Sequence, residues 1–405
     1  MNILVVCQYF YPEEFKVNDL VEGLVLRGHK VTVLTGKPNY PKGEFFTGYK
    51  FSGIQKEEYK GAEVIRVPLI RRGKSGALRL ALNYLSFVFF GNRYIRKSSC
   101  EYDTVLVYQL SPVTMAYPGI KAKKKCGARL ALYVQDLWPE SVSATSSIKG
   151  GPVLKILNRV VRRVYSESDV IFVQSRAFHK SIEEKGDFTD KIVYAPNWAE
   201  DLFVNNSLAD PSRYKHLIPD GFRVMFAGNI GEAQDFDNII NAATCTKGNK
   251  SIIWVIVGDG RAREKAELRI IEENLQDTVV FLGRHPIQEM PSFFCHADAM
   301  LVSLKKEFIF SLTIPSKVQA YMASGKPILS MIDGEGKRVV EESGSGITAC
   351  AEDYMSLVKN VLCMYEMPVE ERVAMGKKGL MYYEENFSKE KILDRIESSL
   401  ISLKP

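Results

Sequence analysis

Short apolar runs alternate with segments of helical periodicity along this chain, and the alternation starts again after residue 219. In the first half, the apolar runs Ile3–Val6 and Val31–Leu34 enclose Asn18–Arg27, whose apolar residues recur on one helical face. The second half opens in the same way, with Arg223–Ala227 followed by Phe236–Ala243. Strands that alternate with helices favour a parallel sheet, whose ligands bind at the carboxyl ends of the strands. The sequence therefore predicts an α/β fold with two doubly wound parallel sheets.

A polar and poorly periodic stretch, Asn205–Pro219, separates the two halves and is typical of a linker between domains. A chain of 405 residues is long enough for two domains of roughly 200 residues, each with its own apolar core. We therefore expect a first domain over residues 1–204 and a second over residues 205–388. A cleft between two such domains is the expected place for an active site.

Charge is divided unevenly between the two halves. Residues 1–200 carry 30 Lys and Arg against 19 Asp and Glu, whereas residues 201–405 carry 24 against 29. The two halves are therefore expected to meet different partners. No signature of an RNA-recognition motif, a helix-turn-helix or a zinc finger accompanies the positive charge, so nucleic acid is not an expected partner.

The cysteines and the N-terminus bear on the compartment. The seven cysteines form no CxxC pair and the five histidines form no HExxH, which favours a reduced, cytoplasmic protein without structural zinc. The first residues, MNILVVCQYFYPEE, lack a basic n-region and break at Tyr11-Pro12. They therefore do not predict a signal peptide.

One apolar segment, Leu80–Gly91, lies inside a basic cluster. Residues 66–97 contain no acidic residue and eight basic ones, namely Arg66, Arg71, Arg72, Lys74, Arg79, Arg93, Arg96 and Lys97. As a helix, the segment would span about 18 Å, well short of the ~30 Å apolar core of a bilayer. One interpretation is an amphipathic segment that lies on the anionic inner leaflet of the plasma membrane. The other is a buried crossover helix with solvated ends.

Polar residues follow two strands of the first half. The loop after the first strand has no GxGxxG, so a dinucleotide is not expected there, but its Glu14 and Lys16 would face the crevice. The strand Arg129–Val134 leads to Asp136, close to Trp138. An acid at the carboxyl end of a strand can act as a general base or orient a substrate. Structural capping by Asp136 is the alternative.

In the second half, the run PSKVQAYMASGKPILSM combines a helix start, a cation and a strand. Pro315 and Ser316 are typical of a helix start and its cap, Lys317 follows in the first turn, and Gly325 ends the helix before the strand Ile328–Met331. The unpaired N–H groups of a helix N-terminus attract anions. The run is thus either a diphosphate site with Lys317 as counter-charge, or an ordinary helix–strand junction whose lysine faces water.

Several motifs occur together in one order, namely Gly28–Val31, Asp136–Glu140, Phe226–Asn229, Val257–Gly260, Phe281–Arg284 and Tyr321–Pro327. With these motifs the chain resembles, over nearly its whole length, the family 4 retaining glycosyltransferases. The resemblance implies the GT-B fold, in which two Rossmann-like domains face a cleft. Within the family, the chain looks most similar to bacterial O-antigen and capsule N-acetyl-L-fucosamine transferases.

The resemblance also implies roles for individual residues. It places a nucleotide-sugar donor on the second domain and a sugar acceptor on the first, onto which residues 389–405 would pack back. Lys317 and Arg263 would take up the charge of the leaving diphosphate, and the backbone of Arg284 and His285 would hold the base. The residues expected around the donor are Gly228, Asn229, Gly231, Arg284, His285, Ser316, Lys317 and Gln319.

Some positions depart from the family pattern. Leu312 and Ala320 stand where many members carry two glutamates, so Ser316 or Gln319 would have to make the ribose contact. Glu307, in the loop before the helix, could approach the sugar.

Two further departures concern charge. Gln135 stands where histidine is often found, which leaves the orienting or base role to Asp136, and Gln234-Asp235 replaces a Lys-Gly of the phosphate loop. No DxD motif occurs where a metal-dependent transferase would use it, so we expect no metal and no other cofactor.

These features predict a retaining glycosyltransferase that moves a sugar such as N-acetyl-L-fucosamine from a UDP-sugar to a polyprenyl-diphosphate-linked saccharide. The acceptor and the inner membrane surface would meet Glu14, Lys16, Arg71, Arg72 and Arg79. Two alternatives remain. One is a GT-B epimerase or phosphorylase, and the other, suggested by the replaced acidic pair, is a non-catalytic membrane scaffold that binds a sugar nucleotide.

Overall fold

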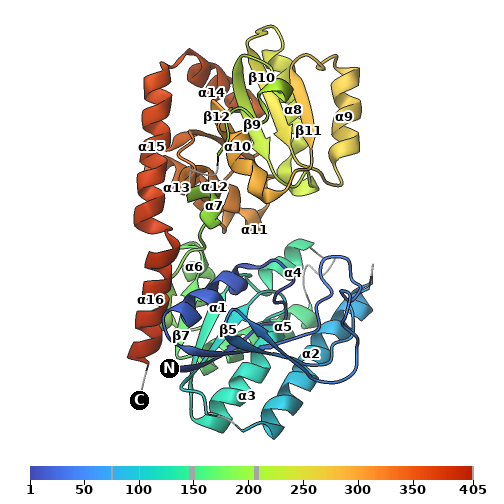
Figure 1. Ribbon diagram of the computed structural model, residues 1–405, viewed down its shortest axis with the longest axis vertical. Helices are drawn as coiled ribbons and strands as arrows, with labels where there is room; N and C mark the ends of the chain where they lie inside the picture. The colour runs from blue at the N-terminus through green and yellow to red at the C-terminus, as the bar shows by residue number, and fades with distance from the viewer. Residues whose placement is uncertain (74–75, 100, 146–150, 205–208, 404–405) are drawn as a thin grey trace. The chain divides into compact units, whose positions relative to one another are not determined.

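The computed structural model describes residues 1–73, 76–99, 101–145, 151–204 and 209–403, so Lys74 and the first part of the predicted linker lie outside the described residues. The chain forms two compact units (Figure 1). The first comprises Met1–Pro196 together with Ile392–Pro405, and the second comprises Asn197–Lys391. This division places residues 197–204 with the second unit and the end of the chain with the first.

The first unit contains an eight-stranded sheet in the order β3-β4-β2-β1-β5-β6-β7-β8. All neighbouring pairs are parallel except β3 and β4, which form an antiparallel hairpin at one edge. The strands are β1 (Asn2–Val6), β2 (Lys30–Thr35), β3 (Gln55–Tyr59), β4 (Ala62–Arg66), β5 (Thr104–Gln109), β6 (Arg129–Val134), β7 (Val170–Val173) and β8 (Ile192–Tyr194).

The helices of the first unit cover the sheet, and all of them except the last, α16, lie between its strands in the sequence (Figure 1). They are α1 (Lys16–Leu26), α2 (Ala77–Lys97), α3 (Tyr117–Cys126), α4 (Glu140–Thr145), α5 (Pro152–Glu167), α6 (Phe178–Glu183) and α16 (Lys389–Ser402). Two short 3-10 helices add Val113–Ala116 and Thr189–Lys191.

Helix α16 packs against α1 of the first unit, although most of the sequence separates them. Gly23 permits the contact, because a Cβ at this position would lie 2.5 Å from a methyl carbon of the buried Leu393. An ion pair and a hydrogen bond flank the packing, with Arg27 Nη2 3.0 Å from Asp394 and His29 Nε2 2.8 Å from Glu397 Oε1. The last helix is therefore a structural part of the first unit.

The apolar segment Leu80–Gly91 forms the middle of α2, which has 21 residues and is longer than the sequence pattern suggests. Helix α2 connects β4 to β5 and packs against α3, where Gly91 leaves room for the ring of Pro118. Within the described part of the chain, no helix combines the length and the apolar content needed to span a membrane.

Loops at the carboxyl edge of the first sheet are tied together by buried side chains. The Glu13 carboxylate accepts hydrogen bonds from the backbone N–H groups of Phe10, Asn39 and Tyr40, at 2.7 to 3.2 Å. Asn18 Oδ1 accepts a further bond from the N–H of Tyr11 at 3.0 Å. Buried carboxylates and amides that bond to backbone in this way fix loop geometry.

The second unit contains a six-stranded parallel sheet in the order β11-β10-β9-β12-β13-β14. Its strands are β9 (Phe222–Ala227), β10 (Ile252–Val257), β11 (Val279–Gly283), β12 (Ala299–Ser303), β13 (Ile328–Met331) and β14 (Gly346–Ala349). Successive residues of β10 enter opposite core clusters, with Val255 in one and Trp254 in the other. The sheet is therefore buried on both faces, as its continuous apolar strands predict.

Helices cover both faces of this second sheet. They are α7 (Asp201–Val204), α8 (Phe236–Thr246), α9 (Arg263–Glu272), α10 (Met290–Phe294), α11 (Phe308–Ser311), α12 (Ser316–Ala323), α13 (Gly334–Ser343), α14 (Tyr354–Glu366) and α15 (Val369–Asn386), with 3-10 helices at Lys215–Leu217, Glu232–Gln234 and Ile287–Glu289. The prediction of two doubly wound parallel sheets is confirmed.

The cysteines differ in part from the expectation of a fully reduced chain. Cys126 is disulfide-bonded, and the expectation is wrong at this position. The cysteines that the structure describes as free are Cys7, Cys245, Cys295, Cys350 and Cys363.

Candidate functional site

Two adjoining cavities open at the carboxyl edge of the second sheet. One has a volume of about 530 Å³ and is lined by the ends of β9 and β12 and the start of α12; the other, of about 600 Å³, is lined by the loop after β10. They share Gly228, Asn229 and Met290. Strand β9 lies between β10 and β12, so the connections from β9 and β12 leave in opposite directions. Open α/β sheets bind ligands at such a point.

Glycines bring the loops after β9 and β10 into backbone contact. Gly228 and Gly258 have φ angles of +133° and +154°. A Cβ on Gly258 would lie only 1.8 Å from the carbonyl oxygen of Gly228. Residues other than glycine would force the loops apart, so this pair explains why glycine stands in both motifs.

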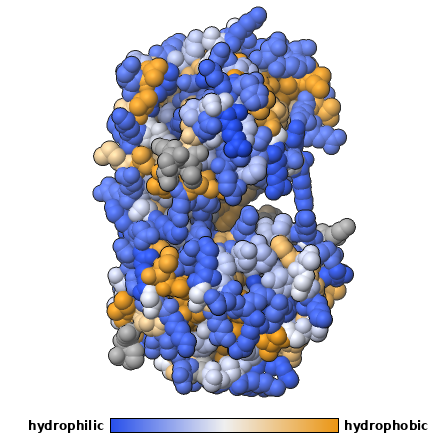
Figure 2. Space-filling model, in the orientation of Figure 1, coloured by the Kyte–Doolittle hydropathy of each residue, from blue (hydrophilic) through white to orange (hydrophobic). Residues whose placement is uncertain are grey.

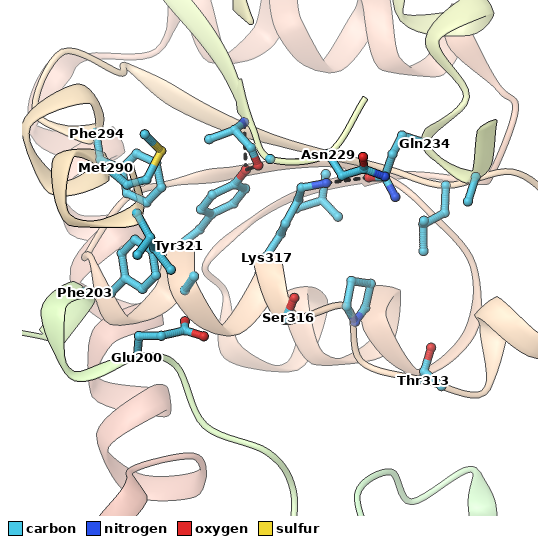
Figure 3. A pocket seen from close by; sticks show the side chains of 18 of the residues that line it. Glu200, Phe203, Asn229, Gln234, Met290, Phe294, Thr313, Ser316, Lys317 and Tyr321 are labelled. Atoms are coloured by element: carbon cyan, nitrogen blue, oxygen red, sulfur yellow. Dashed lines mark hydrogen bonds between the residues drawn. The ribbon is translucent and has the colours of Figure 1, made fainter. Parts of the chain in front are cut away.

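Lys317 is one of the residues that line the first cavity (Figure 3). Its Nζ donates a hydrogen bond of 2.5 Å to Gln234 Oε1 and lies 4.1 Å from the centre of the Phe226 ring. No carboxylate pairs with this ammonium group among the described residues. Burial therefore lowers the pKa of Lys317 from 10.5 to about 7. A desolvated cation without a counter-charge is a binding site for an anion.

Helix α12 holds Lys317 at this point. Tyr321, one turn further along, is buried, and its hydroxyl lies 3.2 Å from both the backbone N and the carbonyl oxygen of Ala227, at the end of β9. The helix begins at Ser316, so Pro315 and not Ser316 stands at the N-cap position, and no side chain caps the helix there. The predicted cap is therefore wrong, and the Ser316 side chain lines the cavity instead (Figure 3).

Several residues predicted from the sequence lie at the two cavities. Gly228, Asn229, Ser316 and Lys317 line the first, and Arg284 and His285 line the second. His285 Nε2 lies 3.0 Å from the carbonyl oxygen of Leu282, and its ring centre lies 4.7 Å from that of Phe293.

Other predicted residues point elsewhere. Arg263 pairs with Glu267 at 2.8 Å and does not line either cavity. Gln319 is buried and donates to the carbonyl oxygen of Asn197. Gly231 lines a separate small hollow, and Glu307 precedes α11 without reaching the cavities.

Two polar residues at the cavities were missed by the sequence analysis. Arg261 is exposed, lines the second cavity and makes no ion pair with any described residue. Its signal was its place directly after Gly258-Asp259-Gly260. Glu200 lines the first cavity, where it brings a carboxylate beside α12 (Figure 3). Glu200 stands four residues after Pro196, with which the main segment of the first unit ends, and it belongs to none of the sequence motifs.

Asp136, in the first unit, is surrounded by donors from its own neighbourhood. Its Oδ2 accepts hydrogen bonds from the hydroxyl of Ser111, from Trp138 Nε1 at 3.2 Å and from Ser141 Oγ at 3.2 Å. Burial raises the pKa of this carboxyl, and these hydrogen bonds oppose the rise. The contacts favour the alternative of structural capping, because they tie the loops after β5 and β6 together.

The other predicted residues of the first unit lie near its sheet edge. Arg72 places its guanidinium carbon 5.3 Å from the ring centre of Tyr40, and its Nη1 lies 3.4 Å from the Tyr9 hydroxyl. Arg71 pairs with Glu44. The remaining three residues are Glu14, which is exposed, Lys16, which lies 3.9 Å from Asp19, and Arg79, whose Nε lies 3.4 Å from the carbonyl oxygen of Arg71.

Both halves of the chain match known family models. Residues 14–198 match the model described as "Glycosyl transferase 4-like domain", and residues 221–367 match "Glycosyl transferases group 1". The chain is also similar to the "Putative colanic acid biosynthesis glycosyl transferase WcaI" of Escherichia coli (strain K12). The two are 25% identical over 414 residues, which cover 97% of this chain and 98% of WcaI.

Two solved structures resemble the fold. Sucrose-phosphate synthase (tll1590) from Thermosynechococcus elongatus has a TM-score of 0.74 at 15% identity, with 99% of this chain and 98% of that chain covered. Anabaena Alr3699/HepE, in complex with UDP and glucose, has a TM-score of 0.65 at 15% identity, with 100% of both chains covered. At these identities the likeness concerns the fold.

Proposed function

We propose a donor, an acceptor and a stereochemical course for this chain, which is a glycosyltransferase with the GT-B fold. Its second unit binds a UDP-sugar, and the enzyme transfers the sugar, with retention of configuration, to a polyprenyl-diphosphate-linked saccharide. The observation that carries the proposal is Lys317, a desolvated cation without a carboxylate partner in the described structure, placed in the first turn of α12.

The chemistry of the leaving group explains why such a cation is needed. When the bond to the sugar breaks, negative charge develops on the diphosphate. A nearby ammonium group and the N–H groups of a helix start lower the energy of that charge without reorganising during the reaction. Because these groups supply the positive charge, the proposed transfer needs no metal and no other cofactor.

The second cavity is the proposed place of the uracil base and ribose. His285 and Arg284 would present their backbone to the base, and the exposed guanidinium of Arg261 would face the phosphates or ribose. Complex formation of HepE with UDP supports UDP as the nucleotide. Glu200 lines the first cavity and is our candidate to replace one of the two glutamates that are absent at Leu312 and Ala320.

The acceptor is proposed to bind the first unit. Tyr9, Phe15 and Tyr40 form an aromatic cluster with ring centres 5.4 to 5.7 Å apart, and Arg72 lies over Tyr40. Aromatic faces suit sugar rings, and the guanidinium group suits a diphosphate. A lipid-linked acceptor would place the enzyme in the cytoplasm, at the inner face of the plasma membrane.

The biological product is proposed to be a surface polysaccharide, either O-antigen or capsule, with an N-acetylated sugar such as N-acetyl-L-fucosamine as the transferred group. Similarity to a protein named for colanic acid biosynthesis supports a surface polysaccharide. The sugar itself rests on the resemblance of the sequence motifs.

A donor and acceptor screen tests this proposal. Purified enzyme is incubated with a panel of UDP-sugars and a short prenyl-diphosphate-linked N-acetylglucosamine, and the products are analysed by mass spectrometry and NMR. We expect UDP release that depends on the acceptor and a product with the donor's anomeric configuration. Conversion without acceptor would indicate an epimerase or phosphorylase, and UDP binding without any turnover would indicate a scaffold.

Arg261 and Arg263 offer a matched pair of substitutions two residues apart. Arg261→Ala should weaken binding of a UDP-sugar about tenfold, since a charge-assisted hydrogen bond to phosphate contributes roughly 1.5–3 kcal/mol and part of it is lost to solvent at an exposed side chain. Arg263→Ala should change it less than about twofold, because Arg263 pairs with Glu267 outside the cavities. Isothermal titration calorimetry measures both. A larger effect at Arg263 would contradict the assignment.

A further inference from the structure

Helix α2 leaves a row of large apolar side chains exposed along much of its length. Leu78, Leu82, Leu85 and Phe89 follow one another at helical spacing and are 75%, 42%, 59% and 63% exposed. The buried residues of the helix are Asn83, Ser86, Phe87, Gly91 and Ile95, so polar and small residues share the buried face with two large apolar ones. A helix that only crosses over a sheet would turn its leucines inward. This exposed row, Leu78, Leu82, Leu85 and Phe89, is called the α2 ridge below.

Buried polar contacts hold the helix in this orientation. Gln8 Nε2 donates to Asn83 Oδ1 at 2.7 Å, and Asn83 Nδ2 donates to the carbonyl oxygen of Ile70. Ser86 Oγ accepts from the N–H of Ile70 at 3.0 Å. Rotation of α2 to bury the ridge would leave these groups without partners, at a free-energy cost for each. These buried contacts therefore fix which side of α2 is exposed.

A groove of about 340 Å³ continues from the ridge toward the end of α2. Leu85, Val88, Phe89 and Asn92 form one part of its lining, and three cations, Arg93, Arg96 and Lys121, form the rest. No carboxylate pairs with these three cations in the described structure. The groove thus offers an apolar wall next to an unneutralised basic wall.

The neighbouring helices extend the positive charge. Helices α2, α3 and α5 are neighbours, since α3 contacts both of the others. Within their bounds stands one acidic residue, Glu167, against twelve basic residues: Arg79, Arg93, Arg96, Lys97, Lys121, Lys123, Lys124, Lys125, Lys155, Arg159, Arg162 and Arg163. Helix α5 adds the exposed apolar residues Val153 and Ile156. Figure 2 shows hydrophilic side chains over most of the visible surface, with hydrophobic ones in scattered patches.

We propose that the face formed by α2, α3 and α5 docks on an anionic phospholipid surface. The α2 ridge enters the boundary between headgroups and acyl chains, and a lipid phosphate occupies the groove between Arg93, Arg96 and Lys121. Apolar side chains flanked by cations match the layered chemistry of such a surface. The surface rests on the proposed function only in that a lipid-linked acceptor makes membrane docking useful, and it shares no residue with the donor cavities.

Other partners fit this face less well. A second copy of the chain would bring two strongly basic faces together, which like-charge repulsion opposes. Nucleic acid would meet the cations, yet four exposed leucine and phenylalanine side chains would gain nothing from phosphate backbones. Charge complementarity and the apolar ridge together favour the lipid surface.

Co-sedimentation of the full chain with vesicles tests the proposal. The wild-type protein is expected to bind phosphatidylglycerol–phosphatidylcholine vesicles and not vesicles of phosphatidylcholine alone. Arg93→Glu, Arg96→Glu and Lys121→Glu in one variant should lower the partition coefficient at least tenfold. A matched control with Lys250→Glu, Lys377→Glu and Lys391→Glu, all exposed in the second unit, should stay within about twofold.

The ridge has its own test. Leu85→Ser with Phe89→Ser should lower vesicle binding at least fivefold, and the binding that remains should disappear at high salt, because only electrostatic attraction is left. All variants should bind UDP with the wild-type affinity, which shows that they are folded and separates this proposal from the donor site. Equal binding to both vesicle types, or full binding by the basic-groove variant, would overturn the proposal. So would a ridge variant that changes the oligomeric state in sedimentation velocity while vesicle binding stays intact.

Discussion

Replacement of Lys317 by alanine is expected to lower kcat/KM for the UDP-sugar about 100- to 1000-fold, the range found when one donor to a developing anion is removed. The free energy of unfolding should stay the same or rise. The ammonium group of Lys317 is desolvated, and no carboxylate among the described residues pairs with it. Its burial therefore costs folding free energy, and an alanine at this position would not carry that cost. Steady-state kinetics and chemical denaturation measure the two quantities.

Lys326 provides the matched control, because it is a second partly buried lysine of the same unit. Its Nζ donates to the carbonyl oxygens of Cys295 at 3.2 Å and Ala297 at 3.1 Å, and burial lowers its pKa. Lys326→Ala should reduce stability by about 1–3 kcal/mol, since two carbonyls lose their donor, and should leave kcat/KM nearly unchanged. If Lys317→Ala destabilised the protein as much as it slowed turnover, Lys317 would be a structural residue and the diphosphate site would be refuted.

Donor affinity is expected to fall roughly 20- to 30-fold between pH 6.5 and pH 8.5. The pKa of Lys317 is about 7 in the free protein, and a bound diphosphate stabilises the protonated form and raises it. Below pH 7 the lysine is already charged and affinity is constant. Above pH 7 binding must take up a proton, so affinity falls by up to tenfold per pH unit. Titration calorimetry with a UDP-sugar, whose diphosphate diester does not titrate in this range, measures the effect.

The variant Lys317→Arg tests whether titration of Lys317 causes the pH dependence of donor affinity. Arginine stays protonated at every pH tested, so its variant should bind the donor with little pH dependence. Proton uptake should also appear as a dependence of the binding enthalpy on the ionisation enthalpy of the buffer. A wild-type affinity that is flat from pH 6.5 to pH 8.5 would contradict the shifted pKa.

The lowered pKa of Lys317 also makes the free energy of unfolding depend on pH, in the direction opposite to donor affinity. Lys317 has a pKa of about 7 in the folded chain and 10.5 as its ordinary value, so the unfolded state binds more protons between these pH values. The penalty of burying this group is therefore fully present below pH 7 and is relieved as the pH rises toward 10.5.

Local patterns of the chain sufficed to predict most of the fold. Apolar runs such as Ile3–Val6 and Arg223–Ala227 are strands wherever alternating helices can cover both faces of a sheet, and these two overlap β1 and β9 within a residue. Lys317 was also predicted, because a helix start followed by a cation is a short-range pattern. The residues that determine these strands and the position of Lys317 are close neighbours in the sequence.

Tertiary contacts decided which side chains reach the site and which face of a helix stays exposed. Arg261 and Arg263 look equivalent in the sequence, yet the loop turns one toward the cavity while Glu267 captures the other. Gln319 turns to Asn197, and the leucines of α2 stay outside because Asn83 is bound from within. The sequence by itself determined the strands, the helices and the place of Lys317. The orientation of the other side chains depends on contacts with residues far away in the sequence. Local periodicity carries no information about those residues.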